Sequence, residues 1–206
     1  IDGEWREGPV IGNLYGGWDI EAMIFGVEDI TDNQERMYQA VIDKLFSHLG
    51  ESGEWKRIKP TSVESNSAPC KEVILTGEDI DIFDFPWLKV HPTDAGRYIN
   101  TGSVFVQDPK LGRNVGTYRC QVKGKTKIGV NARPTQHGGV ILTSMKSRGE
   151  EIAKVAIALG VDPIIWSLSG SKLSGFGEDE LEIAGGLKGK PIEVVKCETC
   201  DIMVPA

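Results

Sequence analysis

A six-residue run from Asn114 to Arg119 combines a side-chain amide, a glycine and an arginine. Gly116 would let a ligand approach the backbone closely, and the Arg119 guanidinium offers a pair of donors to a carboxylate or phosphate. The run therefore predicts an anion site, although a solvated arginine on a surface hairpin fits the same letters. Residues five apart on one regular strand face opposite sides. If Asn114 and Arg119 serve one ligand, Asn114 must lie in the turn before the strand, or Gly116 must form a bulge.

His137 stands between a predicted strand and a predicted helix, in a stretch of irregular backbone of the kind that often carries function. An isolated histidine is nevertheless more often a hydrogen-bonded structural residue than a metal ligand. The other two histidines, His48 and His91, have no carboxylate or cysteine at metal-ligand spacing. The histidines alone therefore do not establish a metal site.

Glu180 lies in a predicted helix over residues 178–187 and shares one face of it with Ile183, Ala184 and Leu187. A carboxylate in an apolar stripe needs a cation, a hydrogen-bond donor or its own proton. Alternatively, Glu180 lies in water at the start of the helix, where the helix dipole favours a negative charge. The sequence leaves both interpretations open.

The four cysteines do not predict a metal or redox site. Cys197 and Cys200 form a CxxC pair, but zinc would need a second pair, and Cys70 and Cys120 are isolated. A thioredoxin-type pair would start a helix, whereas this one stands between strand-like segments. So few cysteines also predict no disulfide scaffold and a reducing, cytoplasmic environment. The sequence contains no Walker loop, GxGxxG or GxSxG motif, which removes support for NTPase, dinucleotide-binding and α/β-hydrolase functions.

Composition predicts a soluble globular protein. The 206 residues include 30 acidic and 23 basic side chains, so the formal charge is −7, which disfavours non-specific binding to nucleic acid. Apolar residues make up 40% and charged residues 26%, as in ordinary folded domains. No apolar run reaches the 18 residues that a membrane-spanning helix needs.

The first 69 residues predict a strand over 9–14 and two helices. The first helix is capped by Asp19 and runs to Phe25. The second begins at a capping box of Thr31 and Gln34 and ends at Gly50, with apolar residues at four-residue spacing. The polar stretch 51–69 predicts a connection, and we place a domain boundary between residues 69 and 70.

After that boundary, strands alternate with helices. The patterns predict strands over 73–76 and 102–107, a turn over 108–112, a hairpin of strands 117–122 and 126–130, a helix over 147–159, a strand over 164–168, a helix over 178–187 and a strand over 192–197. Antiparallel hairpins mixed with helices predict an α+β domain built on a small barrel or open sheet.

The sequence contains an ordered series of motifs: Phe85-Pro86-Trp87-Leu88, the run 91–99, Asp108-Pro109, the run 114–119, Gln136-His137-Gly138-Gly139, the run 179–185 and the run 197–206. Taken together, this series resembles the UbiD family of reversible decarboxylases, which use prenylated FMN. The resemblance implies an FMN-binding split β-barrel-like domain with flanking helices over residues 70–206. Residues 1–69 would be part of a small α/β domain.

The resemblance also implies a site. By motif position, Asn114, His137 and Glu180 would hold a divalent metal, Mn²⁺ or Mg²⁺, against the cofactor phosphate, with Glu182 as the fallback ligand. Arg119 would be catalytic and face both the substrate carboxylate and the cofactor ring. The cofactor would be lined by Gly116, Thr117, Tyr118 and Gln136, and K⁺ would bind near residues 166–171.

The implied activity is reversible, non-oxidative decarboxylation or carboxylation of an aromatic or α,β-unsaturated carboxylic acid, with CO₂ as product or substrate. Family members continue past the motif that ends at Ala206 into a segment with acidic residues for proton transfer, so we expect this chain alone to be inactive. The full-length protein would be a homo-oligomer or part of a carboxylase complex. Two alternatives are an FMN-binding split-barrel oxidoreductase and a non-catalytic subunit.

Overall fold

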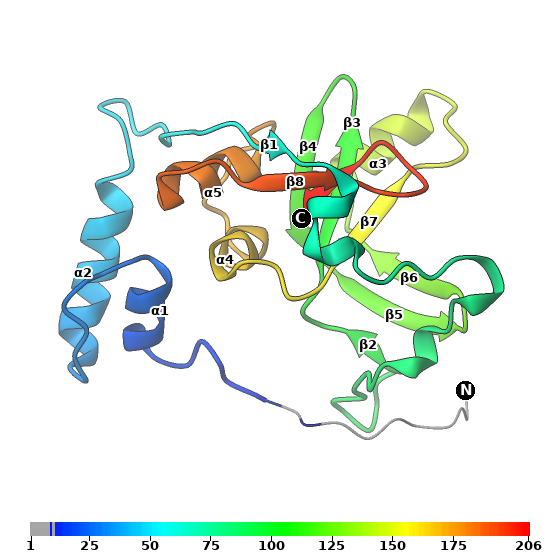
Figure 1. The fold of residues 1–206 in the computed structure, drawn as a ribbon, viewed down its shortest axis with the longest axis horizontal. Coiled ribbons are helices and arrows are strands. Elements are labelled where there is room, and N and C mark those ends of the chain that lie inside the picture. Colours follow the sequence, from blue (N-terminus) through cyan, green and yellow to red (C-terminus); the bar gives the residue numbers. More distant parts are fainter. Residues whose placement is uncertain (1–8, 10) are drawn as a thin grey trace.

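The computed structural model describes residue 9 and residues 11–206. Helices α1 and α2 lie at one end of the molecule, three small sheets lie at the other, and α4 and α5 lie between them (Figure 1). The α-helices are α1 (Trp18–Ile24), α2 (Gln34–Phe46), α3 (His137–Ser147), α4 (Pro163–Gly170) and α5 (Glu180–Lys188). Short 3-10 helices cover Ser65–Ser67, Pro69–Lys71, Gly77–Asp79 and Ile82–Asp84. The predicted α+β class is confirmed.

Each of the three sheets in the described part of the chain has three strands, and together they form no closed barrel. The first has the order β4-β3-β7, the second β2-β5-β6 and the third β1-β8-β9. Their bounds are β1 Thr61–Ser62, β2 Tyr98–Ile99, β3 Ser103–Asp108, β4 Gly112–Thr117, β5 Arg119–Gly124, β6 Lys127–Asn131, β7 Val155–Ala158, β8 Glu193–Lys196 and β9 Met203–Pro205. Of the paired strands, only β1 and β8 run parallel.

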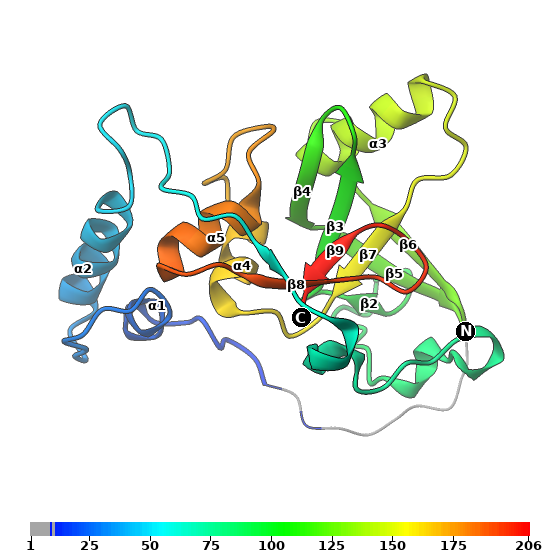
Figure 2. The ribbon, with the colours of Figure 1, turned by 45° about the horizontal axis from the view of Figure 1, so that its top comes forward.

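Two apolar clusters stabilise this arrangement. One joins α1, α2, α4, α5 and β8, and the other joins α3 to the sheet of β2, β5 and β6. Strand β3 contributes to both, because Phe105 faces the first cluster while Val104 and Val106 face the second, and β4 contributes Val115 to the first. The β3–β4 hairpin therefore lies between the two clusters, with β7 beside it (Figure 2).

The predicted turn over 108–112 is confirmed and connects β3 to β4. The Asp108 carboxylate accepts hydrogen bonds from the backbone N–H groups of Lys110 and Leu111, and Gly112 supplies the left-handed φ of +84°. Arg148, just after α3, forms an ion pair with the same carboxylate. Burial raises the pKa of Asp108, but these hydrogen bonds outweigh it and hold that pKa below its usual value.

The chain changes sheets at Tyr118, between β4 and β5. Asn114 and Arg119 therefore lie on two different strands, so the condition that Asn114 lies in a turn or that Gly116 forms a bulge, which assumed a single strand, does not apply. The register of β3 and β4 is unbroken across this stretch, with Val106 opposite Asn114 and Val104 opposite Gly116. A change of sheet, not a bulge, separates the two side chains.

The helix predicted over 147–159 is wrong. Ser147 is the last residue of α3, and Gly149 has a left-handed φ of +84°. The N–H groups of Gly149 and Glu150 bond back to the carbonyls of Lys146 and Met145, which is a helix-ending pattern. The apolar run that follows forms β7 and pairs with β3, because a short apolar run fits a strand as well as a helix.

The strand predicted over 164–168 is also wrong, because this segment lies in α4. Asp162 caps the helix by accepting from the Ile164 N–H, and Pro163 occupies the first turn. The strand predicted over 73–76 has no partner among the described residues, and its apolar side chains are exposed. The strand predicted over 9–14 falls partly outside the described residues, and residues 11–14 form no strand.

Both predicted helices near the start of the chain are present, but Asp19 lies in the first turn of α1 and does not cap it, because Gly17 holds the N-cap position. The second begins after Asn33, whose side chain accepts from the Arg36 N–H, and so Asn33, not Thr31, caps it. The boundary between residues 69 and 70 stays a prediction. On its N-terminal side, Trp55 donates to the Leu173 carbonyl at 2.7 Å, and β1 pairs with β8.

Candidate functional site

Glu180 is the first residue of α5 and is 1% exposed. One oxygen, Oε1, accepts hydrogen bonds from Asn114 Nδ2 and Ser174 Oγ, each at 2.9 Å. The other, Oε2, accepts from the Val115 N–H at 2.9 Å. The interpretation that Glu180 lies in water is therefore wrong, and this carboxylate joins α5 to β4.

The Glu180 carboxylate has hydrogen-bond donors but no ion-pair partner among the described residues. Among the ion pairs of the described residues, none includes Glu180. Burial raises the pKa of Glu180, although the hydrogen bonds from Val115 and Ser174 act in the opposite direction. A buried carboxylate of this kind is suited to a bound cation, because the attraction between the two charges would offset the free-energy cost of removing the carboxylate from water.

Tyr118 links Asn114 to the start of α3. Its hydroxyl donates to Asn114 Oδ1 at 2.8 Å and accepts from the Gly138 N–H at 3.0 Å. Burial raises the pKa of Tyr118, so the phenol keeps its proton at neutral pH. Two glycines make room for the ring: a Cβ would lie 2.4 Å from the hydroxyl oxygen at Gly116 and 2.6 Å from it at Gly138.

Gly138→Ala is expected to displace the Tyr118 hydroxyl and break the chain of hydrogen bonds to Asn114. Overpacking a filled site costs about 1–3 kcal/mol of the free energy of unfolding. Chemical denaturation of the variant measures this loss. Gly124→Ala is the matched control, because a Cβ there would meet nothing closer than 3.7 Å. Equal stability of the two variants would contradict the predicted role of Gly138.

His137 and the network around Glu180 line one cavity of about 580 Å³. His137 begins α3 and is half-buried, with its ring edge-on to Phe176 at a centroid distance of 5.4 Å. The cavity is lined by Asn114, Val115, Gly116, Thr117, Tyr118, Arg133, Thr135, Gln136, His137, the run 168–172, Ser174 and Glu180. All the predicted cofactor-lining residues except Arg119 are therefore brought together.

The donors in this cavity are suited to a hard cation and an anion. Amide, carboxylate and imidazole groups are ligands for Mn²⁺ or Mg²⁺. Arg133 and Lys172 also line the cavity and are suited to a phosphate, and sequence reasoning missed both. Within the described residues, no cluster of three or more His, Cys, Asp or Glu could hold a metal. The predicted ligand set does not form such a cluster, because it contains only one histidine and one carboxylate, and its third donor is the Asn114 amide.

The segment predicted to bind K⁺, residues 166–171, ends α4 and borders the same cavity. Ser169 Oγ lies 3.0 Å from Thr117 Oγ1 and 3.1 Å from Ser103 Oγ, and it donates to the Trp166 carbonyl at 2.8 Å. These hydroxyl contacts tie α4 to β3 and β4. The K⁺ role stays a prediction.

Arg119 does not line the cavity. It follows Tyr118 at the start of β5, and 59% of its side chain is exposed. Its Nη2 donates to Asp94 Oδ1 at 3.1 Å, and its guanidinium lies 4.2 Å from the centre of the Tyr98 ring. The half-buried Glu182, predicted as the fallback ligand, also does not line the cavity.

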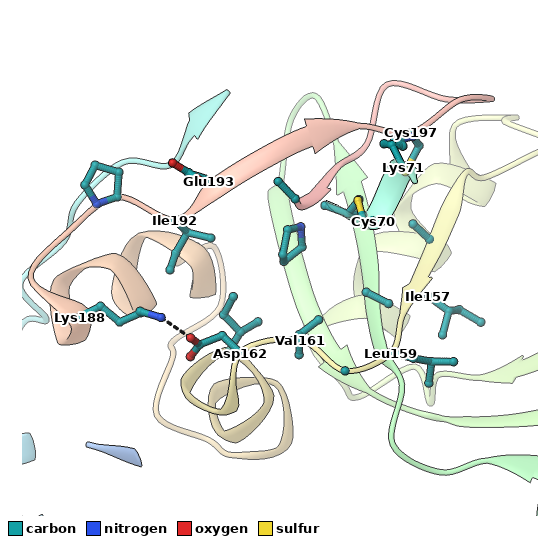
Figure 3. A pocket seen from close by; sticks show the side chains of 18 of the residues that line it. Cys70, Lys71, Ile157, Leu159, Val161, Asp162, Lys188, Ile192, Glu193 and Cys197 are labelled. Carbon is teal, nitrogen blue, oxygen red and sulfur yellow. Dashed lines mark hydrogen bonds and ion pairs between the residues drawn. The ribbon is translucent and has the colours of Figure 1, made fainter. Parts of the chain in front are cut away.

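A second cavity, of about 610 Å³, lies between the β7–α4 connection and β8 and includes Cys70 and Cys197 (Figure 3). Lys188 and Asp162 form an ion pair across it. Burial first, and then the neighbouring Cys200, raises the pKa of Cys197 to about 11. A protonated thiol is a poor nucleophile, so Cys197 is not suited to be the reactive thiolate of a redox centre.

The profile of the 3-octaprenyl-4-hydroxybenzoate carboxy-lyase Rift-related domain, UbiD, matches residues 61–206. The chain belongs to the UbiD family. The resemblance seen in the sequence is thus confirmed. None of the described helices has the length and apolar character needed to cross a membrane.

Several UbiD-family relatives are decarboxylases. The chain is 28% identical to the phenolic acid decarboxylase of Sedimentibacter hydroxybenzoicus, over 96% of this chain and 40% of that protein. It is 31% identical to the phenolic acid decarboxylase of Bacillus subtilis, over 94% of this chain and 39% of that protein. An evolved dimeric form of HmfF from Pelotomaculum thermopropionicum, in complex with prenylated FMN, superposes with a TM-score of 0.78 at 31% identity, over 94% and 42% of the two chains. The chain therefore spans about two-fifths of the length of these relatives.

Proposed function

We propose that this chain is the cofactor-binding part of a carboxy-lyase that uses prenylated FMN and a divalent metal ion. The reaction would be reversible decarboxylation of an aromatic or α,β-unsaturated carboxylic acid. The observation that carries the proposal is the shared cavity of Asn114, His137 and the buried Glu180, which has no ion-pair partner among the described residues. The relatives named as decarboxylases, and the HmfF structure with prenylated FMN, support it.

Different residues of the cavity would bind different parts of the cofactor. Asn114, His137 and Glu180 would hold Mn²⁺ or Mg²⁺ at the cofactor phosphate, and Arg133 and Lys172 would neutralise the remaining phosphate charge. The flavin would lie against Gly116, Thr117, Tyr118 and Gln136, with K⁺ near residues 166–171. Prenylated FMN, when bound, supplies a sink for the electron pair that loss of CO₂ leaves behind.

Arg119 would act on the substrate carboxylate, beside the cofactor ring that it is also predicted to face. It directly follows Tyr118, which does line the cavity, and its guanidinium is exposed where a carboxylate can reach it. A guanidinium can orient a carboxylate through two parallel hydrogen bonds and can stabilise negative charge. The full-length protein would act in the cytoplasm as a homo-oligomer or within a carboxylase complex.

The test is to express the complete gene together with a flavin prenyltransferase and to analyse the purified protein. Mass spectrometry and absorbance should identify prenylated FMN, and elemental analysis should find a divalent metal. Release of CO₂ from vanillic acid or cinnamic acid, and uptake of label from ¹³C-bicarbonate, should show the reaction in both directions. Loaded protein that neither releases CO₂ nor exchanges label with any acid of a broad panel would overturn the proposal, and ordinary FMN without metal would favour a flavin oxidoreductase.

A further inference from the structure

The guanidinium of Arg119 is fixed by two side chains to which sequence reasoning gave no role. Asp94 Oδ1 accepts a hydrogen bond from Nη2 at 3.1 Å, and the Tyr98 ring lies 4.2 Å from the guanidinium carbon. Tyr98 on β2 is opposite Gln121 on β5, and Gln121 is two residues after Arg119. The Tyr98 ring and the Arg119 side chain therefore lie on the same face of the sheet.

Asp94 is itself held rigidly. Its second oxygen, Oδ2, accepts from the His91 N–H at 3.0 Å, while its own N–H donates to the His91 carbonyl at 3.0 Å. Only 16% of its side chain is exposed, against 59% for Arg119. These hydrogen bonds lower the pKa of Asp94: the bond from the His91 N–H contributes most, burial opposes it, and Arg119 adds to the lowering. The anchor is thus a fixed, ionised carboxylate.

Asp94 leaves most of the guanidinium free. An arginine carries five N–H donors, and within the described residues the Arg119 side chain uses only Nη2, for Asp94. A carboxylate ligand needs two parallel donors from one edge of the group. One hydrogen bond and one ring contact can therefore fix the plane of the guanidinium while an edge remains available.

We propose that Asp94 and Tyr98 are positioning residues, which hold Arg119 in the orientation that receives the substrate carboxylate. This inference rests on the proposed function insofar as Arg119 binds that carboxylate. A competing interpretation is that Asp94 shields Arg119 and must be displaced by the substrate. The two interpretations predict opposite effects of removing the Asp94 charge.

The variant Asp94→Asn distinguishes the positioning role of Asp94 from the shielding role. The amide oxygen can still accept from the His91 N–H, but an amide N–H₂ then faces the guanidinium, so the turn survives and the anchor is lost. Because small misplacements of a reacting group can cost up to about 100-fold in rate, we expect kcat of the loaded full-length enzyme to fall about tenfold or more, with KM changed less than about threefold. Asp94→Glu should recover part of the rate. Asp201→Asn is the matched control, because it removes the partner of Lys196 in an exposed ion pair beside a different sheet.

A second measurement does not need turnover. Phenylglyoxal modifies exposed guanidinium groups, and peptide mass spectrometry gives the rate for Arg119 alone. This rate should rise in Asp94→Asn and in Tyr98→Leu, while Tyr98→Phe, which keeps the ring, should stay close to the parent protein.

The outcomes separate failure of this inference from failure of the proposed function. If Asp94→Asn keeps the parent kcat and lowers KM, Asp94 is a shield and the inference is wrong. If the modification rate of Arg119 is the same in every variant, neither residue positions it, and the inference is also wrong. If the parent enzyme has no decarboxylase activity, the proposed function fails, whereas the modification rates still decide whether Asp94 and Tyr98 fix Arg119.

Discussion

Replacing Arg119 with alanine is expected to reduce kcat/KM of the loaded full-length enzyme about 100- to 1,000-fold, the usual loss when a preorganised charge-stabilising donor is removed. The flavin should stay bound, because Arg119 is absent from the residues that line the cavity. Stability should change by less than about 0.5 kcal/mol, since most of the side chain is exposed. Steady-state kinetics, with flavin absorbance per mole of protein, measures both effects.

The matched control is Arg133→Ala, which also removes an arginine side chain, but one that lines the cavity. This variant should retain less cofactor, and its rate per bound flavin should change little. Arg119→Lys should be intermediate between alanine and the parent enzyme, because lysine keeps the charge but lacks the planar pair of donors. Near-normal turnover in Arg119→Ala would remove Arg119 from the mechanism.

The elements that sequence patterns predicted correctly are those specified by local chemistry. The turn at Asp108 is specified by a side chain that caps its own following backbone and by Gly112 at positive φ. The helix that contains Glu180 follows a capping residue, Asp179, which accepts from the Leu181 N–H. Such signals act within a few residues, so one sequence is enough to detect them.

The wrong predictions concern segments whose local sequence pattern fits both a helix and a strand. Tertiary contacts decide between the two. The run Val155–Ala158 is apolar enough for a helix, but it pairs along β3. The β-branched Ile164 and Ile165 favour a strand, yet the Asp162-Pro163 start and burial among α5 and β4 make them helical. Residues Ser147–Glu150 resemble a capping box that would start a helix. They instead lie at the end of α3, which Gly149 terminates with its left-handed backbone conformation.

The candidate site was predictable only in part for the same reason. The residues carried by motifs, Asn114, His137 and Glu180, do line one cavity. Ser174, Arg133 and Asp94 were missed, because each reaches its partner through contacts that no spacing in the sequence reveals. The sequence also could not decide whether Glu180 is buried, and only the packing of α5 on β4 does so.

Glu180→Gln is expected to abolish retention of the divalent metal and, with it, tight binding of the cofactor. Glutamine keeps the shape of the side chain but removes the one negative charge among the three predicted ligands. Metal affinity should fall more than about 100-fold, because even residues that only support metal ligands are worth about 10- to 100-fold. Elemental analysis and flavin absorbance of the full-length protein, purified after co-expression with the prenyltransferase, measure the loss.

The control for this variant is Glu182→Gln, which makes the same chemical change two residues further along α5. Glu182 is half-buried and does not line the cavity, so its variant should keep metal and flavin at parent levels. The fold should survive in Glu180→Gln, because a neutral amide costs less to bury than a carboxylate and its oxygen can still accept from the Val115 N–H, even though Asn114 Nδ2 then loses its acceptor. Full metal content in Glu180→Gln, or loss of metal in Glu182→Gln, would show that the buried carboxylate at the start of α5 is not the group that holds the cation.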